Sequence, residues 1–322
     1  MKEIRILLTM DCEPTIATNS PRASGPADWA QGERAVKGYF NIAQSYGFPV
    51  TYFLHPEAAI AQADLFKKFA DRGACLGLHM HPWKYSMWRH GSQKYFEDYG
   101  GLSEADQRSL LNESSKLWAE AIGFRPLYFR PGTFSANDAM YSALAAEGFR
   151  GGSCSIPGRV WPDVRAVWSG AEPDPHRANA LFRHIRGSLE FADVPCSVDF
   201  STVLNEEAKR RQQHPDLRPD TDWQAKYGIS YTTTAANILA QIKARAPAVP
   251  VIVILTHNHF EYSDDASAIT RRLKASLDAV REACSATGVV LVGSTIAEVV
   301  DQLLSVPAVP EVFTSPESVR FS

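Results

Sequence analysis

Short apolar runs alternate with longer segments that repeat their apolar positions at helical spacing along most of the chain. The clearest apolar run, residues 249–256, is of the buried-strand type. The other predicted strands are residues 4–10, 50–54, 75–80, 127–130, 149–154, 189–194 and 289–292. The predicted helices are residues 29–46, 57–72, 103–122, 135–147, 233–246, 265–286 and 295–304.

Strands that alternate with helices favour a parallel sheet covered by helices. Seven or eight such units in about 300 residues predict an α/β fold of the irregular (β/α) barrel type. No linker, composition shift or repeat marks a second domain, so one barrel domain over residues 1–322 is expected. The Pro-rich stretch 157–185 is expected to be irregular, and the tail from residue 307 is expected to be surface coil.

Composition narrows the classes of function. Hydrophobic residues make up 45% of the chain, enough for a large core, and the net charge of -3 indicates neither a nucleic acid nor an anionic membrane as partner. No stretch approaches the ~18 apolar residues of a membrane span. Five widely spaced cysteines without a CxxC pair favour a reducing compartment. The apolar run at residues 6–10 is too short for a signal-peptide core, so a cytoplasmic location is predicted. The oligomeric state leaves no signature in the sequence.

Reactive side chains follow four of the predicted strands. They are Asp11 and Glu13, His79 and His81, Arg130, and His257. Because reactive groups of β/α barrels gather at the carboxyl ends of the strands, we expect these side chains to meet in one site. Each has a commoner explanation when taken alone, such as a solvated loop, a surface ion pair or a core histidine. Their coincidence at four strand ends favours a catalytic site.

Spacing adds a metal to this prediction. Side chains two residues apart on a strand point to the same side, so Asp11 can accompany Glu13, and His79 can accompany His81. Two imidazoles and one carboxylate leave positions open on a divalent ion, which is typical of catalytic zinc-type sites.

Four short motifs give these residues a family context. They are Thr9-Met10-Asp11-Cys12, Gly77-Leu78-His79-Met80-His81-Pro82, Arg130-Pro131-Gly132-Thr133 and Leu255-Thr256-His257. In this order they resemble the motifs of the polysaccharide deacetylases, the carbohydrate esterase family with the nodulation-deacetylase homology domain. Residues 153–158 also resemble a segment of that family, and the resemblance covers most of the chain.

The chain departs from the family pattern at three places. Cys12 stands where the family usually has a second Asp that binds the metal, so we assign that role to Glu13 and keep Asp11 as the base. The two histidines are separated by one residue instead of three. The fourth motif, an Asp with a following Trp, is not clear, and Trp161-Pro162-Asp163 is the nearest match.

The resemblance implies a metal-dependent hydrolase that removes an acetyl or formyl group from the nitrogen of an amino sugar or glycan precursor. Glu13, His79 and His81 would bind a divalent metal, with zinc expected. Asp11 would act as base, Arg130 would pair with it, and His257 would protonate the departing amine. The predicted substrate-binding residues are Trp83, Thr133, Trp161 and His259, with an oxyanion donor near Thr133.

Two other functions stay open. One is a hydrolase of the same fold that cleaves a non-sugar C–N amide bond. The other is a carbohydrate-binding protein that has lost catalysis, an alternative suggested by Cys12. The sequence leaves the sugar, the acyl group and the identity of the metal undetermined.

Overall fold

A long, curled sheet forms the centre of the protein in this computed structural model, which describes residues 1–16, 24–91 and 94–308. Its strands follow the order β12-β1-β2-β3-β4-β5-β9-β8, and β13 pairs with β1. These strands are β1 (Glu3–Cys12), β2 (Val50–Leu54), β3 (Cys75–Met80), β4 (Tyr128–Pro131), β5 (Gly151–Gly152), β8 (His176–Arg177), β9 (Ala192–Asp193), β12 (Val251–His257) and β13 (Val290–Gly293).

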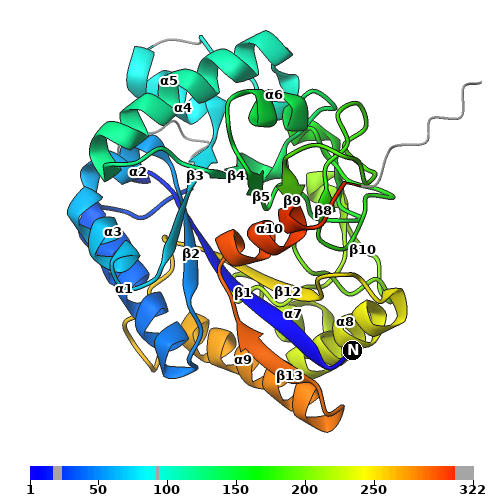
Figure 1. Ribbon diagram of the computed structural model, residues 1–322. Helices are drawn as coiled ribbons and strands as arrows, with labels where there is room; N and C mark the ends of the chain where they lie inside the picture. Colours follow the sequence, from blue (N-terminus) through cyan, green and yellow to red (C-terminus); the bar gives the residue numbers. More distant parts are fainter. Residues whose placement is uncertain (17–23, 92–93, 309–322) are drawn as a thin grey trace, which may run out of the picture.

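Apart from β8, which runs antiparallel to β9, the paired strands of this sheet are parallel. Strand β1 is central, and β12 pairs with one of its edges. Along the other edge, β13 pairs with the first half of β1 and β2 pairs with the second half. Within the described residues no strand pair links β9 to β12. Instead, the Ser197 hydroxyl accepts a hydrogen bond of 2.9 Å from the Val253 amide. The sheet is therefore a curled half-barrel, and the predicted α/β fold of irregular barrel type is confirmed (Figure 1).

Helices surround the outer side of the curled sheet (Figure 1). They are α1 (Trp29–Ser45), α2 (Pro56–Ala61), α3 (Ala63–Ala70), α4 (Pro82–His90), α5 (Glu104–Ile122), α6 (Met140–Ala146), α7 (Trp223–Tyr227), α8 (Tyr231–Arg245), α9 (Ala268–Ala286) and α10 (Ile296–Ser305). Most of the longer ones begin at a capping side chain, as α5 does at Ser103, whose hydroxyl accepts from the Asp106 amide at 3.1 Å. Among the described residues, no helix has the length and apolar character that a membrane span requires.

The core lies on both faces of the central strands. From Ile4 to Cys12 almost every residue of β1 is buried, and the first six residues of β12 are buried as well. Continuous burial is typical of parallel strands that are covered on both faces. This burial explains why residues 249–256 form the clearest apolar run of the sequence.

The structure differs from the predicted elements in several places. The predicted helix 57–72 divides into α2 and α3 at Gln62, and the predicted helix 135–147 begins only at Met140. The predicted cap, Ser135, has extended backbone, with φ −67° and ψ 130°, and Ala139 is the N-cap of α6 instead. Helices α4 and α7 were not predicted.

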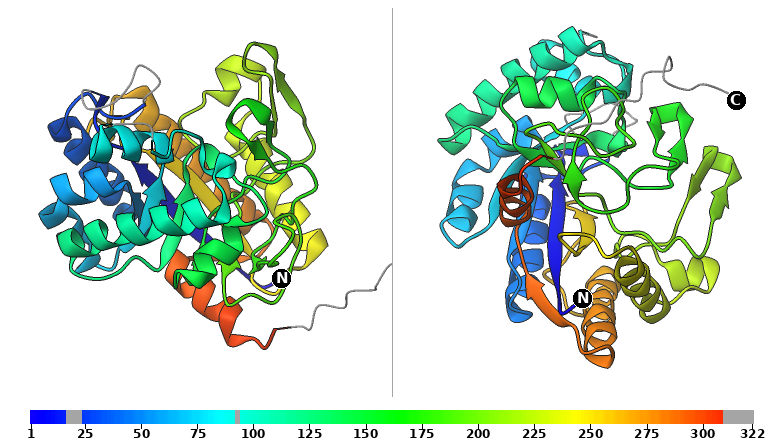
Figure 2. Two further views of the ribbon diagram at one scale, coloured as in Figure 1. Left: turned by 90° about the horizontal axis from the view of Figure 1, so that it is seen from above. Right: turned by 45° about the vertical axis from the view of Figure 1, so that its right-hand side comes forward.

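A second, four-stranded sheet was also missed. It joins β10 (Leu204–Glu206), β11 (Arg211–Gln213), β6 (Val160–Trp161) and β7 (Ala166–Val167), and it stands beside the main sheet (Figure 2). Two of its strands fall in the stretch 157–185 that was expected to be irregular. Strands of two or three residues are too short for their sequence to show a repeating pattern.

Candidate active site

Strand register brings the predicted reactive residues to one end of the sheet. In the β1–β12 pair Asp11 lies opposite His257, and in the β3–β4 pair His79 lies opposite Arg130. Glu13 follows β1 directly, two residues after Asp11. All of these residues lie at the carboxyl ends of parallel strands, and the curl of the sheet turns them toward one another.

Glu13, His79 and His81 form a buried cluster. The Nε2 atoms of His79 and His81 lie 3.2 Å and 3.0 Å from Oε1 of Glu13. Their ring planes are nearly perpendicular, at 86°. One potential ligand atom of each residue lies within 4.8 Å of the other two. The structure thus brings together the three residues predicted to bind a metal.

The tautomer of His79 indicates that a cation belongs in this cluster. Its Nδ1 lies 3.0 Å from the carbonyl oxygen of Arg130, which can only accept a hydrogen bond, so Nδ1 carries the proton. In the neutral ring, Nε2 then presents a lone pair to the carboxylate of Glu13, which is itself an acceptor. A proton or a metal ion has to lie between the two atoms. Metal-binding histidines are commonly held in this way, so the residues fit a divalent metal.

His81 is suited to the same role. Burial lowers the pKa of His81 to about 4, against the opposing effect of Glu13, so its ring is neutral at pH 7. Neutral imidazole is the form that binds metals. The ring lies against the backbone of Gly132, where an added Cβ would come within 2.3 Å of it. Glycine in the Arg-Pro-Gly-Thr motif is therefore required by this close approach.

Two residues that sequence reasoning missed hold Glu13 in place. The ammonium of Lys84 donates to Oε2 of Glu13 at 2.7 Å and to the Ser24 carbonyl at 2.9 Å, and its side chain is 1% exposed. The side chain of Asn258 accepts from the amide of Glu13 and donates to its carbonyl. Burial alone would raise the pKa of Glu13, but His81, Lys84 and His79 hold it well below its usual value. Oε1 is thereby left to face the imidazoles.

Asp11 and Arg130 form a buried ion pair beside this cluster. Nη1 of Arg130 donates to Oδ1 of Asp11 at 2.7 Å and to the Thr9 hydroxyl at 2.9 Å. The other carboxylate oxygen of Asp11, Oδ2, lies 4.0 Å from Nδ1 of His79 and 3.9 Å from Nε2 of His257. One oxygen is therefore fixed by the guanidinium while the other faces the centre of the site.

His257 has a carboxylate partner of its own, Asp220. Nδ1 of His257 lies 2.5 Å from Oδ2 of Asp220, whose other oxygen accepts from the Thr256 hydroxyl. Burial alone would lower the pKa of His257, but Asp220, followed by Asp11 and Glu13, raises it above its usual value. The side chain of His257 is 25% exposed, so the site opens to solvent at this residue.

Sequence reasoning placed the fourth motif elsewhere. Asp163, the nearest match then, is half-exposed and forms an ion pair of 3.1 Å with Arg210. The segment Asp220-Thr221-Asp222-Trp223 has the same order of Asp followed by Trp and supplies the carboxylate that contacts His257. The sequence did carry this signal, in a loop that has no strand pattern to draw attention to it.

Cys12 points away from the site. Its side chain is fully buried in the hydrophobic core, and burial raises the pKa of its thiol well above the usual value. His55, at the end of β2, is also fully buried, and burial lowers the pKa of its ring well below the usual value. Neither residue belongs to the cluster of Glu13, His79 and His81.

The four predicted substrate-binding residues are spread over different places. Trp83 packs 6.2 Å from the ring of His81, and the ring of His259 lies 5.2 Å from that of His257. Thr133 lies in the strained turn after β4. Trp161 lies in the second sheet, where the guanidinium of Arg211 stacks on its ring. Within the described parts of the chain, no ring or ion contact joins Trp161 to the cluster. Three other aromatic residues, Tyr85, Tyr99 and Trp168, are buried in the core.

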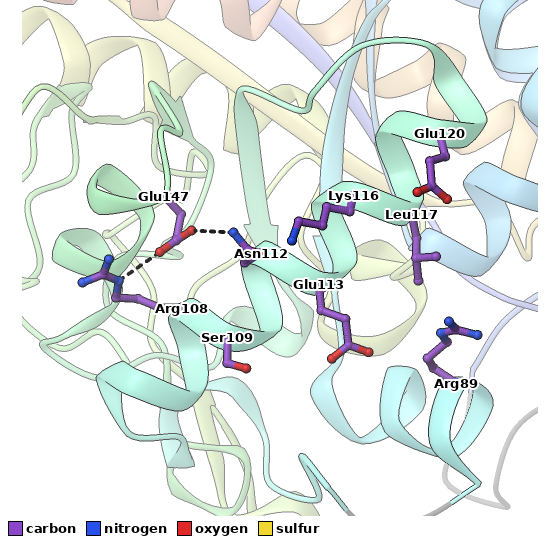
Figure 3. Close-up of a pocket in the computed structure, with 9 residues that line it drawn as sticks. All are labelled: Arg89, Arg108, Ser109, Asn112, Glu113, Lys116, Leu117, Glu120 and Glu147. Carbon is purple, nitrogen blue, oxygen red and sulfur yellow. Dashed lines mark hydrogen bonds and ion pairs between the residues drawn. The ribbon is translucent and has the colours of Figure 1, made fainter.

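A cavity of about 570 Å³ lies away from these residues, between α4, α5 and the end of α6 (Figure 3). Its lining residues are Arg89, Arg108, Ser109, Asn112, Glu113, Lys116, Leu117, Glu120 and Glu147. Several of its charges are already paired, as Glu147 is with Arg108 at 2.9 Å (Figure 3). None of the predicted site residues lines this cavity.

The fold and the site define a half-barrel α/β protein with a buried carboxylate–imidazole cluster suited to a metal. The family model described as polysaccharide deacetylase matches residues 3–152. Over these residues the chain matches the polysaccharide deacetylase family, and the resemblance inferred from the motifs is confirmed.

Solved structures support the fold over nearly the whole chain. A protein from Mycobacterium smegmatis whose structure carries a polysaccharide-deacetylase name shares 16% identity at a TM-score of 0.61, with 98% of this chain and 95% of that chain covered. The allantoinase Puue shares 13% identity at a TM-score of 0.58, with 94% and 90% covered. A protein of Pseudomonas aeruginosa PAO1 with a similar polysaccharide-deacetylase name shares 12% identity at a TM-score of 0.53, with 93% and 90% covered. A search of curated protein sequences found no match.

Proposed function

We propose that the protein is a metal-dependent hydrolase that removes an N-acetyl or N-formyl group from an amino sugar or glycan precursor. The observation that carries this proposal is the buried cluster of Glu13, His79 and His81 beside the Asp11–Arg130 pair. The family match over residues 3–152 supports the same class of reaction.

The cluster of Glu13, His79 and His81 is the proposed binding site of the metal that activates the acyl carbonyl. A divalent metal, with zinc as the proposed ion, would supply Lewis acidity toward the acyl carbonyl and the attacking water when bound there. His79 and His81 offer Nε2 atoms to it, and Glu13 offers Oε1. The Arg130 carbonyl orients the ring of His79, and Lys84 orients the carboxylate of Glu13.

Asp11 is the proposed base. Arg130 holds its Oδ1, and Oδ2 is left facing the centre of the site, where it can take the proton of the attacking water. His257 is the proposed acid. Its raised pKa favours the protonated ring, and its Nε2 lies 3.9 Å from Oδ2 of Asp11, at the centre of the site, where it can protonate the departing amine. The strained turn at Thr133 is the proposed source of an oxyanion donor.

The test is an assay for released acid. The purified protein is supplied with Zn²⁺ and incubated with N-acetylated and N-formylated amino sugars, and acetate and formate are quantified. We expect release that depends on the metal and falls by about 10² to 10⁴ in Asp11→Asn. Failure of every amide substrate with metal-loaded, folded protein would refute the proposal.

The same incubation with other substrates separates the alternatives. A cyclic amide such as allantoin, the substrate implied by the name of the allantoinase structure, tests for hydrolysis of a non-sugar amide. Ring opening frees no acetate or formate, so the ring-opened carboxylate is quantified for this substrate. An inactive carbohydrate-binding protein would release no acid from any substrate. Against that last alternative, Cys12 lies in the core, so its presence removes no group from the cluster.

Two further proposals concern the chain as a whole. We propose that residues 1–322 form a single barrel domain, because Asp220 and His257, outside the matched range, join the same site. We also propose a cytoplasmic location, which all five cysteines support by being unpaired thiols.

A further inference from the structure

Arg159 is a buried cation that has no counter-charge among the described residues. Its residue is 3% exposed, and its guanidinium lies over the ring of Phe134, 5.5 Å from the ring centre. Its Nε and Nη2 atoms have no hydrogen-bond partner, and no carboxylate pairs with it within the described residues. Proteins rarely bury an unpaired charge, because removing an ion from water is costly. This guanidinium therefore lacks an anion.

The neighbouring carboxylates are already engaged by other arginines. Arg218 binds Asp216, with 2.6 Å between Nε and Oδ2, and Arg211 binds Glu206 at 2.8 Å. Burial, and then repulsion by Arg218 and Arg211, hold the pKa of Arg159 well below its usual value. Arg159 therefore adds a local surplus of positive charge, which no carboxylate among the described residues pairs with.

This surplus lies next to the proposed catalytic residues. The ring of Phe134 also stacks near the guanidinium of Arg130, 5.6 Å from its centre, so one ring separates Arg159 from the Arg130–Asp11 pair. On another side, Arg218 is close enough to Asp220 to lower its pKa. The guanidinium of Arg159 thus lies beside the proposed catalytic residues, with the ring of Phe134 between it and the Arg130–Asp11 pair.

We propose that Arg159 binds an anionic group of the substrate, a phosphate or a carboxylate, so that the substrate is an anionic N-acyl amino sugar. This inference rests on the proposed function, because it names the class of substrate for the same site. A planar guanidinium pairs with either oxyanion through two parallel hydrogen bonds. The substrate anion would thereby supply the charge that the buried side chain lacks.

Binding by calorimetry tests the proposal with three probes: N-acetylglucosamine, N-acetylglucosamine 1-phosphate and N-acetylmuramic acid, which carries a carboxylate. The unchanged protein should bind one of the anionic probes at least about tenfold more tightly than the neutral sugar. The preferred probe distinguishes phosphate from carboxylate. Equal binding of all three overturns the proposal, and this comparison requires no variant to fold.

Variants then connect the preference to the residue. Arg159→Met should lose the preference, while Arg210→Met should keep it, because Arg210 is an exposed arginine in the connection between β10 and β11. In anion-free buffer, Arg159→Met should melt no lower than the unchanged protein, since a buried unpaired charge has been removed. A lower melting temperature together with an intact preference would mean a structural role and would overturn the proposal. If Arg159→Met does not fold, Arg159→Gln replaces it under the same criteria.

Hydrolysis separates this inference from the function on which it rests. Acid release with equal kcat/KM for neutral and anionic substrates would refute the role of Arg159 and leave the proposed reaction standing. Preferential binding through Arg159 without acid release from any probe would leave the anion site standing and count against the reaction.

Discussion

Replacing Arg130 by methionine should destabilise the protein strongly, because it leaves the carboxylate of Asp11 buried without its partner. Asp11 is 2% exposed and Arg130 is fully buried. Breaking a buried ion pair from one side typically costs about 3–5 kcal/mol. The hydrogen bonds of Arg130 to the Thr9 hydroxyl and the Ser153 carbonyl are lost as well, each worth about 1 kcal/mol. The methionine recovers part of the packing against Phe53, on which the guanidinium stacks at 4.3 Å.

The assay is reversible denaturant unfolding in the presence of a chelator, so that differences in metal binding do not enter the free energy of unfolding. A loss of 3–5 kcal/mol corresponds to a fall in Tm of about 4 to 8 °C for a chain of this length. Arg150→Met serves as the control: Arg150 pairs with Asp301 at the surface, and its loss should cost less than about 1 kcal/mol.

The double variant Asp11→Asn/Arg130→Met identifies the cause of the loss. Removing both charges should restore more than half of the stability lost in Arg130→Met, although activity stays absent. The reasoning is refuted if Arg130→Met stays within about 1 kcal/mol of the unchanged protein. It is equally refuted if the double variant is no more stable than Arg130→Met, since the cost would then not come from an uncompensated carboxylate.

Three further predictions concern the site. Asp11→Asn should keep the metal and lower the turnover number by about 10² to 10⁴. Glu13→Gln should instead lose bound metal, and excess Zn²⁺ should restore part of the turnover. If metal analysis shows the reverse pattern, the roles of the two residues are exchanged. Lys84→Met should weaken Zn²⁺ affinity about 10- to 100-fold in competition titrations, because Glu13 loses the group that orients it, and unchanged affinity would exclude that role. Asp220→Asn removes a cause of the raised pKa of His257, so His257 loses its proton at a lower pH. The alkaline limb of the pH profile of kcat/KM should therefore move to lower pH, and an unmoved limb would contradict the assignment of His257 as the acid.

The pairs Asp11–Glu13 and His79–His81 could be predicted from the sequence because they depend on local geometry. A strand places every second side chain on the same side, and parallel strands align their carboxyl ends, so an apolar run followed by spaced reactive residues already defines a face. The burial of Cys12 in the core follows from the same alternation. The α/β barrel class could likewise be predicted from the alternation of strand and helix patterns.

Lys84 and Asp220 show what only the tertiary structure decided. Lys84 reaches Glu13 from the first turn of a helix across 71 positions of sequence, and Asp220 reaches His257 from an irregular loop across 37. Arg159 also comes from an irregular segment, and its lack of a counter-charge becomes visible only when its neighbours are placed. A repeating pattern reports which face of an element a side chain occupies, whereas contacts between loops depend on the path of the whole chain. That path is set by the packing of the core, which no short segment of sequence contains.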